Sequence, residues 1–262
     1  MVIRMHDFTL NKYLTLCQFL KAQNYSFLSV KEYIESKEEG LLPERFVIIR
    51  HDVDRWLHNA VRMADEEHRI GIHSTYYFRY PATFHPDSMQ HISRLDHEIG
   101  YHYEVVSKNN GDLKKAMEQF GRELSSFRSF IQVHTICMHG DPLSPYDNRT
   151  LWNTYHFKDF GIIGEAYLSL SNLRYFTDTG RTWAGNRAIY DTMSELTQKP
   201  LLSCTEDLIN WIRNNSPPQL YLTVHPERWA PGLLRYLASW SMDTMVNIAK
   251  IVLKLVRRKT CF

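Results

Sequence analysis

The chain has 262 residues, 44% of them hydrophobic, and a formal net charge of only +2 at pH 7. This length allows one large domain or two small ones, and the hydrophobic share is sufficient for a packed core. The nearly balanced charge, without a long basic block before the C-terminus, argues against nucleic acid as the main partner.

The four cysteines, Cys17, Cys137, Cys204 and Cys261, are widely scattered and form no C-x-x-C pair. We therefore expect neither a disulfide framework nor a structural zinc cluster, and a reducing compartment is the default. The N-terminus lacks the apolar core and cleavage site of a signal peptide. No apolar run approaches the roughly 20 residues that a membrane span requires. These features predict a cytoplasmic protein without a membrane-spanning segment.

Apolar residues recur at a period of 3.6 near the N-terminus and predict a first helix over 9–23. Strands are expected at 46–51, 74–80, 98–103, 131–138, 162–167, 174–177 and 220–224, and helices at 60–68, 86–95, 113–124 and 206–214. This alternation predicts an α/β fold, with a parallel sheet and helices outside it. No stretch rich in Pro or Gly resembles a linker, so we expect residues 1–262 to form a single domain.

A C-terminal helix is predicted over 231–258. Four apolar residues fall on one side of its second half: Met245, Ile248, Val252 and Leu255. Four cations lie at its end: Lys254, Arg257, Arg258 and Lys259. The simpler interpretation is a terminal helix packed on the fold, with cations that complement its dipole. The alternative is a basic amphipathic helix that makes peripheral contact with an anionic membrane surface.

The segment Phe46–Asp54 is the most informative part of the chain, because a β-branched run ends in two carboxylates. Side chains two apart on a strand point the same way, so Arg50, Asp52 and Asp54 share one face. Two such carboxylates repel each other unless a cation or a proton compensates. We expect a buried parallel strand that delivers both acids to the rim of a sheet or barrel. Alone, Asp52 could be a helix N-cap, and Asp54 could pair with Arg50 or Arg55.

Histidines occur at three further strand ends. His102 shares a strand face with Glu98 and Glu104, the strand at 220–224 leads into His225, and His139 follows a β-rich run. Imidazole together with carboxylate is suited to zinc or another divalent metal ion. Each histidine alone is more often structural, and only their combination predicts a site. We expect His51 to face away from the acids, and six others to be solvated: His58, His68, His73, His85, His91 and His97.

In their order, the segments 50–54, 98–102 and 221–226 resemble the motifs of the polysaccharide deacetylase family, carbohydrate esterases that act on N-acetyl sugars. The resemblance covers roughly residues 45–230. It is closest to a divergent branch found among surface-polysaccharide genes, in which three further stretches recur: 139–144, 146–149 and 177–183. It implies a distorted (β/α) barrel of about seven strands.

The resemblance also implies a metal-dependent hydrolase that removes an N-acyl group, usually acetyl, from an amino sugar. Asp52 matches the general base, which takes a proton from water, and Asp54 matches a metal-binding acid. His102 matches the first metal histidine, and His225 matches the acid that protonates the departing nitrogen. Zinc is the expected ion. The amino sugar could be free, nucleotide-linked or lipid-linked.

One position departs from the family pattern. The second metal histidine is expected four residues after His102, where this chain has Val106. We expect His139 to replace it as a ligand, with Glu104 as the second choice. The substrate-binding residues that we expect are Asp178, Arg181, Trp183, Tyr103 and Trp229. The first two match positions that orient catalytic groups or contact substrate, whereas the aromatic rings suit stacking on sugars or simply form core.

Two other functions stay open. A glycosyltransferase could use Asp52-Val-Asp54 as a D-x-D motif that holds metal and nucleotide diphosphate, and it would not need His102 or His225. A non-catalytic sugar-binding relative could have kept the barrel and lost the metal, and Val106 is the residue that suggests it.

Overall fold

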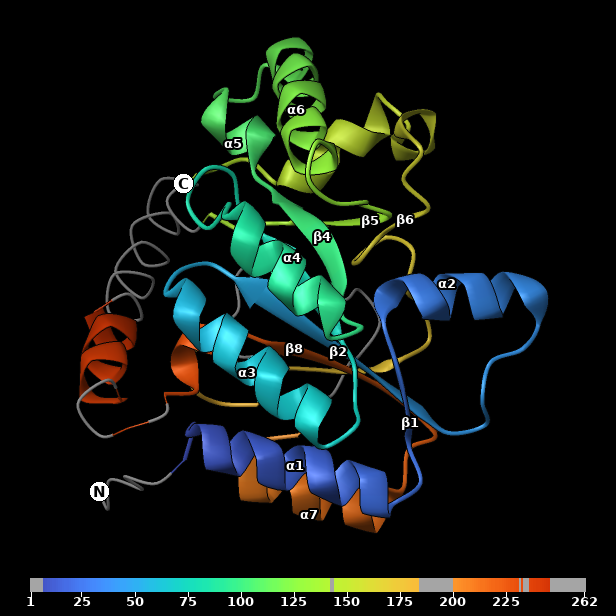
Figure 1. Ribbon diagram of the computed structural model, residues 1–262, viewed down its shortest axis with the longest axis vertical. Coiled ribbons are helices and arrows are strands. Elements are labelled where there is room, and N and C mark those ends of the chain that lie inside the picture. The colour runs from blue at the N-terminus through green and yellow to red at the C-terminus, as the bar shows by residue number, and fades with distance from the viewer. Residues whose placement is uncertain (1–6, 142–143, 184–199, 231, 233–235, 246–262) are drawn as a thin grey trace, which may run out of the picture.

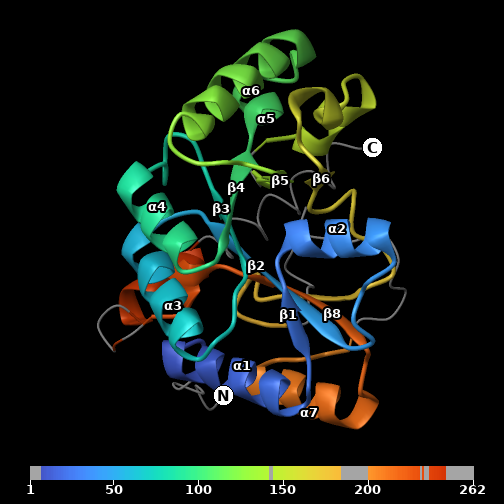
Figure 2. The same ribbon diagram turned by 45° about the vertical axis from the view of Figure 1, so that its right-hand side comes forward.

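Figures 1 and 2 show the computed structural model, which describes residues 7–141, 144–183, 200–230, 232 and 236–245. Eight parallel strands form its sheet: β1 (Ser26–Leu28), β2 (Phe46–Val53), β3 (Thr75–Phe78), β4 (Glu98–Tyr103), β5 (Thr135–Met138), β6 (Gly164–Glu165), β7 (Arg174–Thr177) and β8 (Gln219–Val224). Seven of them follow the order β6-β5-β4-β3-β2-β8-β7 and form a curled half-barrel. The eighth, β1, pairs with the first half of β2, beside the point where β3 begins to pair.

Helices cover the outside of this sheet. The α-helices are α1 (Leu10–Ala22), α2 (Val30–Glu39), α3 (Leu57–Arg69), α4 (Pro86–Arg94), α5 (Val105–Lys108), α6 (Leu113–Arg128) and α7 (Thr205–Asn215). Three 3-10 helices are η1 (Asn148–Asn153), η2 (Phe157–Phe160) and η3 (Pro226–Arg228), and residues 236–245 form a further helix. In Figure 1, α1 and α7 lie side by side at one end of the molecule, and α3 and α4 lie together over the sheet.

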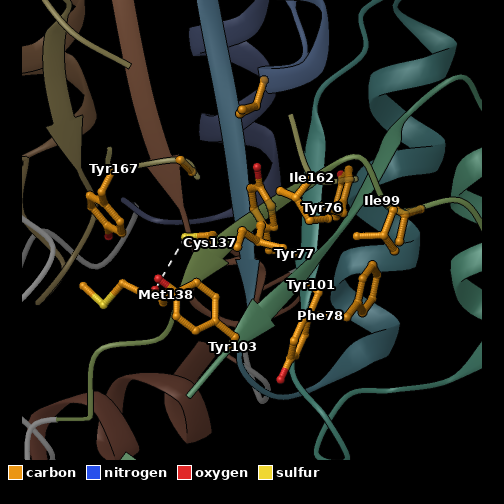
Figure 3. Close-up of a cluster of buried hydrophobic side chains, with 14 of the residues drawn as sticks. Tyr76, Tyr77, Phe78, Ile99, Tyr101, Tyr103, Cys137, Met138, Ile162 and Tyr167 are labelled. Carbon is orange, nitrogen blue, oxygen red and sulfur yellow. Dashed lines mark hydrogen bonds between the residues drawn. The ribbon is translucent and has the colours of Figure 1, made fainter. Parts of the chain in front are cut away.

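The central strand β2 is buried along its whole length, and its two faces pack into different apolar clusters. Phe46 and Ile48 join the cluster that contains the aromatic rings of β3 and β4, part of which Figure 3 shows. Val47 and Ile49 join a second cluster with α1 and α7. Because side chains alternate along a strand, a fully buried parallel strand reads as a continuous apolar run. This explains why the sequence alone predicts a strand at residues 46–51.

The predicted α/β class and the parallel sheet are confirmed, and every expected strand and helix overlaps an observed element. The expected strand at 162–167 shrinks to the two residues of β6. Three elements were missed, β1, α2 and α5, as were the 3-10 helices η1, η2 and η3. The predicted helix over 231–258 is described only at 236–245, and the rest of it lies outside the described residues. The single-domain organisation stays a prediction. Among the described residues, no helix combines the length and the apolar character that crossing a bilayer requires.

The prediction that His97 is solvated was wrong. Its side chain is buried, Nδ1 accepts a hydrogen bond from the Ser74 backbone N–H (3.1 Å), and Nε2 donates to the Ala64 carbonyl (3.1 Å). Burial lowers the pKa of His97, so the ring is neutral and has one donor and one acceptor, as these contacts require. In the sequence His97 follows a polar helix end, but the sequence does not show that α3 packs over this histidine.

His97 borders a buried polar cluster centred on Glu67 of α3, on the face of β2 opposite the paired acids. Nε2 of His51 lies 2.8 Å from Glu67 Oε1, and the hydroxyls of Tyr13, Ser74 and Tyr76 also donate to this carboxylate. Burial alone would raise the pKa of Glu67, but His51 and the hydrogen bonds outweigh it and bring the value to about 2. His51 thus faces away from the acids, as expected, and binds the helix behind them.

We predict that Glu67→Ala lowers the free energy of unfolding by roughly 3–5 kcal/mol, because it leaves several buried donors without an acceptor. The pKa of Glu67 is lower in the folded chain than in the unfolded chain. Its stabilising effect is therefore present above about pH 4.5 and is lost as the pH falls towards 2. Urea unfolding between pH 3 and 7 measures both effects.

Asp65→Ala on the same helix is the control, because Asp65 is half exposed and pairs with the half-exposed His91. It should change the stability by less than about 1 kcal/mol. Equal losses for Glu67→Ala and Asp65→Ala would show that the buried cluster contributes little.

Candidate active site

Polar side chains gather where six of the parallel strands end. Asp54 follows β2, Arg79 follows β3, His139 follows β5, Asp178 follows β7 and His225 follows β8, while His102 is the penultimate residue of β4. The carboxyl ends of parallel strands meet at one edge of a sheet, and this is where ligands bind in α/β proteins. The structure therefore brings the predicted catalytic and metal-binding residues to one place.

Two histidines converge on Asp54. Its Oδ1 atom lies 3.5 Å from Nε2 of His102 and 3.5 Å from Nε2 of His139. The two rings are nearly perpendicular, with centroids 5.2 Å apart. No described residue forms a hydrogen bond with this buried oxygen. Ligand atoms around a tetrahedral zinc ion with bonds of about 2.0–2.1 Å lie roughly 3.3–3.4 Å apart, so each of these two contacts with Asp54 has the separation that such an ion requires.

The other nitrogen of each imidazole faces a polar group. Nδ1 of His102 lies 3.0 Å from the carbonyl oxygen of Cys137, which can only accept, so Nδ1 carries the proton and Nε2 keeps its lone pair. Nδ1 of His139 lies 2.9 Å from Oε2 of Glu104 without hydrogen-bond geometry, and Arg79 donates to the same Oε2 (2.7 Å). The hydrogen bond to Cys137 fixes the tautomer of His102, as such bonds do in metal-binding histidines, and the carboxylate of Glu104 lies against the ring of His139. Glu104, our second choice of ligand, therefore lies behind His139.

The electrostatics of this set favour a cation. Burial would raise the pKa of Asp54, but the adjacent His139 and His102 outweigh it and hold the value well below its usual range. Burial lowers the pKa of His102 against the opposing effect of Asp52 and Asp54, so this ring is neutral at pH 7. A charged carboxylate and a neutral imidazole are the protonation states in which Asp54 and His102 bind a metal. Burial lowers the pKa of His139, but Asp54 and Glu104 outweigh it and raise the value, so His139 must give up a proton to bind a metal.

A second group of potential ligand atoms comes from Asp52, His102 and Cys137, and among the described residues it is the group whose atoms all lie within 4.8 Å of one another. We favour the Asp54 set for two reasons. The side chain of Asp54 is 21% exposed, whereas Cys137 is completely buried, so only the Asp54 set can meet a substrate. Asp52 is moreover paired with Arg50 and does not need a metal to balance its charge.

The pair of Asp52 and Arg50 is buried in the half-barrel. Nη2 of Arg50 donates to Oδ2 of Asp52 (2.9 Å), and Nε lies 2.9 Å from Oδ1 without hydrogen-bond geometry. The same guanidinium donates to the hydroxyls of Tyr221 (2.8 Å) and Tyr167 (2.6 Å). Arg50 therefore fixes the orientation of Asp52 and leaves Oδ1 without a hydrogen-bond donor among the described residues. The expectation that Asp52 could be a helix N-cap is wrong, as is a pairing of Asp54 with Arg50.

Asp178 orients His225 at the ends of β7 and β8, which lie on the side of β2 away from β3, β4 and β5. Nδ1 of His225 donates to Oδ1 of Asp178 (2.6 Å), and the backbone N–H of His225 donates to Oδ2 (2.9 Å). Arg228 and the indole of Trp229 also donate to this carboxylate, at 2.5 and 2.8 Å. Burial and Arg228 lower the pKa of His225, but Asp178 outweighs them and raises it to about 9. His225 is therefore protonated at neutral pH, with Nε2–H available to donate.

Glu227 is a further buried acid at this edge. Its carboxylate lies 3.8 Å from Nε of Arg55, and Oε2 has no hydrogen-bond partner among the described residues. Burial and the nearby charge of Asp54 raise the pKa of Glu227 to about 7. Glu227 thus carries part of a negative charge at neutral pH.

The three predicted aromatic contacts with substrate find no support in their placement. Tyr103 lies among packed side chains in Figure 3, and its ring is completely buried. Trp183 and Trp229 are each 1% exposed and pack together with Phe8. None of these rings offers a face to a sugar here. The guanidinium of Arg181 pairs with Asp243 at 2.8 Å.

The sequence analysis assigned no role in the site to four side chains that the structure places there: Arg50, Arg79, Glu227 and Arg228. Arg50 was recognised only as sharing the face of the acids, although the i, i+2 spacing already placed it beside Asp52. Arg79 follows β3 just as Asp54 follows β2, which was an available signal. Glu227 and Arg228 directly follow His225-Pro226, but nothing in the sequence shows that their side chains turn back into the site.

Among solved structures, this chain is similar to a family 4 carbohydrate esterase from Streptococcus mutans (10% identity, TM-score 0.46, 88% of this chain and 90% of that chain). It is also similar to a pseudoenzyme of the same family from Bacillus anthracis (11%, TM-score 0.46, 79% and 61%). A third is the peptidoglycan deacetylase PdaC from Bacillus subtilis (11%, TM-score 0.39, 82% and 97%). The chain thus spans less than two thirds of the length of the pseudoenzyme.

Two of these neighbours thus belong to carbohydrate esterase family 4, and the third is a peptidoglycan deacetylase. No protein family model and no curated protein matches the chain. The similarities concern the fold only, and they assign no activity to this chain.

We predict that the purified protein binds one zinc ion, and that His102→Ala and His139→Ala each abolish this binding because they remove a ligand. Glu104→Gln should weaken the affinity roughly 10–100-fold, since it removes the charged carboxylate that lies against the ring of His139. Metal analysis after dialysis, together with a competition titration against a chelator, measures both effects.

Cys137→Ser is the matched control, because it alters only the second group of ligand atoms. It should leave zinc stoichiometry and affinity unchanged. Loss of zinc in Cys137→Ser with retention in His139→Ala would assign the metal to the second group instead.

Proposed function

We propose that this protein is a metal-dependent hydrolase that removes an N-acyl group, usually acetyl, from an amino sugar in surface-polysaccharide metabolism. The observation that carries the proposal is the arrangement of three functional groups at one sheet edge. A ligand set of Asp54, His102 and His139, an oriented carboxylate of Asp52, and a protonated His225 each have a separate role in amide hydrolysis.

Asp54, His102 and His139 would hold the metal, with zinc as the expected ion. When bound, such a metal ion acts as a Lewis acid and lowers the pKa of water. The exposed flank of this set is formed by Asp54 and His139, so an acyl group has access there. The position expected to hold the second metal histidine, Val106, is buried in the core, and His139 takes over its role from a neighbouring strand end.

Asp52 acts as the general base. Its Oδ1 has no hydrogen-bond donor among the described residues and can receive the proton of an attacking water. Arg50 holds the other oxygen and compensates the buried charge, so the carboxylate does not rotate away. Oδ2 of Asp52, the oxygen to which Arg50 donates, lies 3.8 Å from Nε2 of His102, so this carboxylate lies beside the metal ligands.

His225 acts as the general acid, from the end of β8 on the side of β2 away from His102 and His139. Amide hydrolysis fails without protonation of the nitrogen, because an amine anion is too poor a leaving group. Asp178 fixes Nδ1 and keeps the ring charged, so Nε2 is the atom that donates the proton. This Asp–His pair is the part of the site that a D-x-D glycosyltransferase would not need. Nothing in the described residues favours that alternative.

We predict that Asp52→Asn keeps the zinc ion and loses roughly 10²–10⁴-fold in kcat on an N-acetylated amino-sugar oligosaccharide. The amide cannot accept the proton, whereas the ligands of the metal are untouched. Acetate release and metal analysis on the same preparation give both values. Wild-type protein that holds zinc but releases no acetate from any N-acylated sugar would identify a non-catalytic sugar-binding relative.

The activity should fall as the pH rises through about 9, where His225 loses its proton. Because Asp178 raises the pKa of His225, Asp178→Asn should move this alkaline limb to lower pH and reduce kcat at neutral pH. The pH profile of kcat for the wild type and the variant tests this. An alkaline limb at the same pH in both proteins would exclude His225 as the acid.

A further inference from the structure

The helix at 236–245 has its polar face turned inwards and its apolar face turned outwards. The buried residues of this helix are Tyr236, Ser239 and Asp243. Large apolar side chains are exposed by 40–71%: Leu237, Trp240, Met242 and Met245. A helix on a globular protein normally buries its apolar stripe, so this helix presents a surface for which the described fold supplies no cover.

Polar contacts with the fold determine which side faces inwards. Asp243 accepts hydrogen bonds from Nη2 of Arg55 (2.5 Å) and Nε of Arg181 (2.8 Å). Ser239 donates to the carbonyl oxygen of Glu227 (2.7 Å) and accepts from Nη2 of Arg181 (2.5 Å). A rotation that buried Trp240 would break these contacts and take Asp243 away from Arg55 and Arg181, which are partly buried. These polar contacts therefore fix the helix with its apolar face towards the outside.

Figure 1 shows this helix in red at the outer edge of the molecule, beyond α3. Its exposed positions carry no charge, since Ala238 and Ser241 fill the places between the large apolar side chains. Indole and thioether side chains of this kind suit the boundary between water and lipid.

The sequence after this helix indicates what covers the apolar face. No acidic residue follows Asp243, whereas five cations do: Lys250, Lys254, Arg257, Arg258 and Lys259. A second copy of the chain would bring these like charges together, and neutral partners would gain nothing from them. An anionic lipid surface attracts the cations and accepts the apolar side chains at the same time.

We propose that the C-terminal segment from residue 236 onwards attaches this protein to the surface of an anionic bilayer, with Trp240 and Met245 as apolar anchors. The attachment is peripheral. Asp243 connects the anchoring helix to Arg55, which directly follows Asp54, so the candidate active site lies next to the attached segment.

Co-sedimentation of the full-length protein with vesicles tests this, using phosphatidylcholine alone and phosphatidylcholine with 30% phosphatidylglycerol. We expect at least tenfold tighter binding to the anionic vesicles and a loss of binding with added salt. Combined Arg257→Gln, Arg258→Gln and Lys259→Gln should weaken binding on the order of 100-fold, at about 1 kcal/mol per cation, a roughly fivefold change for each. Trp240→Ser should weaken binding several-fold, as should Met245→Ser.

Matched controls change the same chemistry elsewhere. Leu41→Ser removes an apolar side chain that is 69% exposed, and Lys114→Gln with Lys115→Gln removes two cations from α6. Both controls should bind as the wild type does, and circular dichroism checks that every variant is folded. Equal binding to neutral and anionic vesicles would overturn the proposal, as would equal losses in the controls. A dimer that Trp240→Ser dissociates, without vesicle binding by the wild type, would assign the apolar face to self-association.

Discussion

The burial of a charged pair in the central strand determines how the rest of the site is built. Arg50 and Asp52 both lie inside the half-barrel, where an isolated guanidinium or carboxylate would be strongly unfavourable. Their ion pair, together with the hydroxyls of Tyr221 and Tyr167, supplies the partners that water would otherwise provide. Because the partners come from β8 and from the segment after β6, the pair couples the orientation of Asp52 to strands on both sides of the half-barrel. Removing either member would leave the other as an unpaired buried charge.

Side chains alternate between the two faces of β2, and each face makes its own buried polar contact. Arg50 and Asp52 point into the half-barrel, whereas His51 between them points outwards to Glu67 on α3. The strand is therefore held on one face by the ion pair and on the other by a buried carboxylate that accepts from several donors. Asp54 lies just beyond this doubly held stretch, so its position relative to β4 and β5 is well defined.

Most of the site was predictable from the sequence because two simple periodicities govern it. The i, i+2 spacing placed Asp52 and Asp54 on one side, and the shared carboxyl edge of parallel strands brought His102 and His139 to them. The placement of His139 beside Asp54 could be inferred although Val106 interrupts the expected motif. The residues that orient these groups were harder to predict. Glu104 was considered as a ligand, and only the structure shows it behind His139, because the sequence does not show how side chains that follow two different strands, β4 and β5, lie relative to each other.

The helix α2 was missed and the burial of two aromatic rings was not resolved by the sequence, each for its own reason. The helix α2 has few apolar residues, although Ser29 and Glu32 form a capping box and Gly40 ends the helix in a left-handed conformation. Those local signals were present, but apolar periodicity was weak, so the helix was missed. Trp183 and Trp229 were assigned to substrate because they lie near the motifs. Proximity in sequence does not show whether a large ring faces a cleft or the core, and here packing against Phe8 decides it.

The acids at the active edge differ in one respect that explains why a cation belongs at Asp54. Four other acids each have an arginine within 4 Å: Asp52 with Arg50, Glu104 with Arg79, Asp178 with Arg228, and Glu227 with Arg55. Among the described residues, Asp54 pairs with no arginine or lysine, and only the two imidazoles of His102 and His139 approach its carboxylate. A permanent side-chain cation beside Asp54 would compete with a metal ion, whereas imidazoles can give up their protons and bind it. The arginines therefore neutralise the acids that must stay in place and leave one carboxylate free to bind a metal.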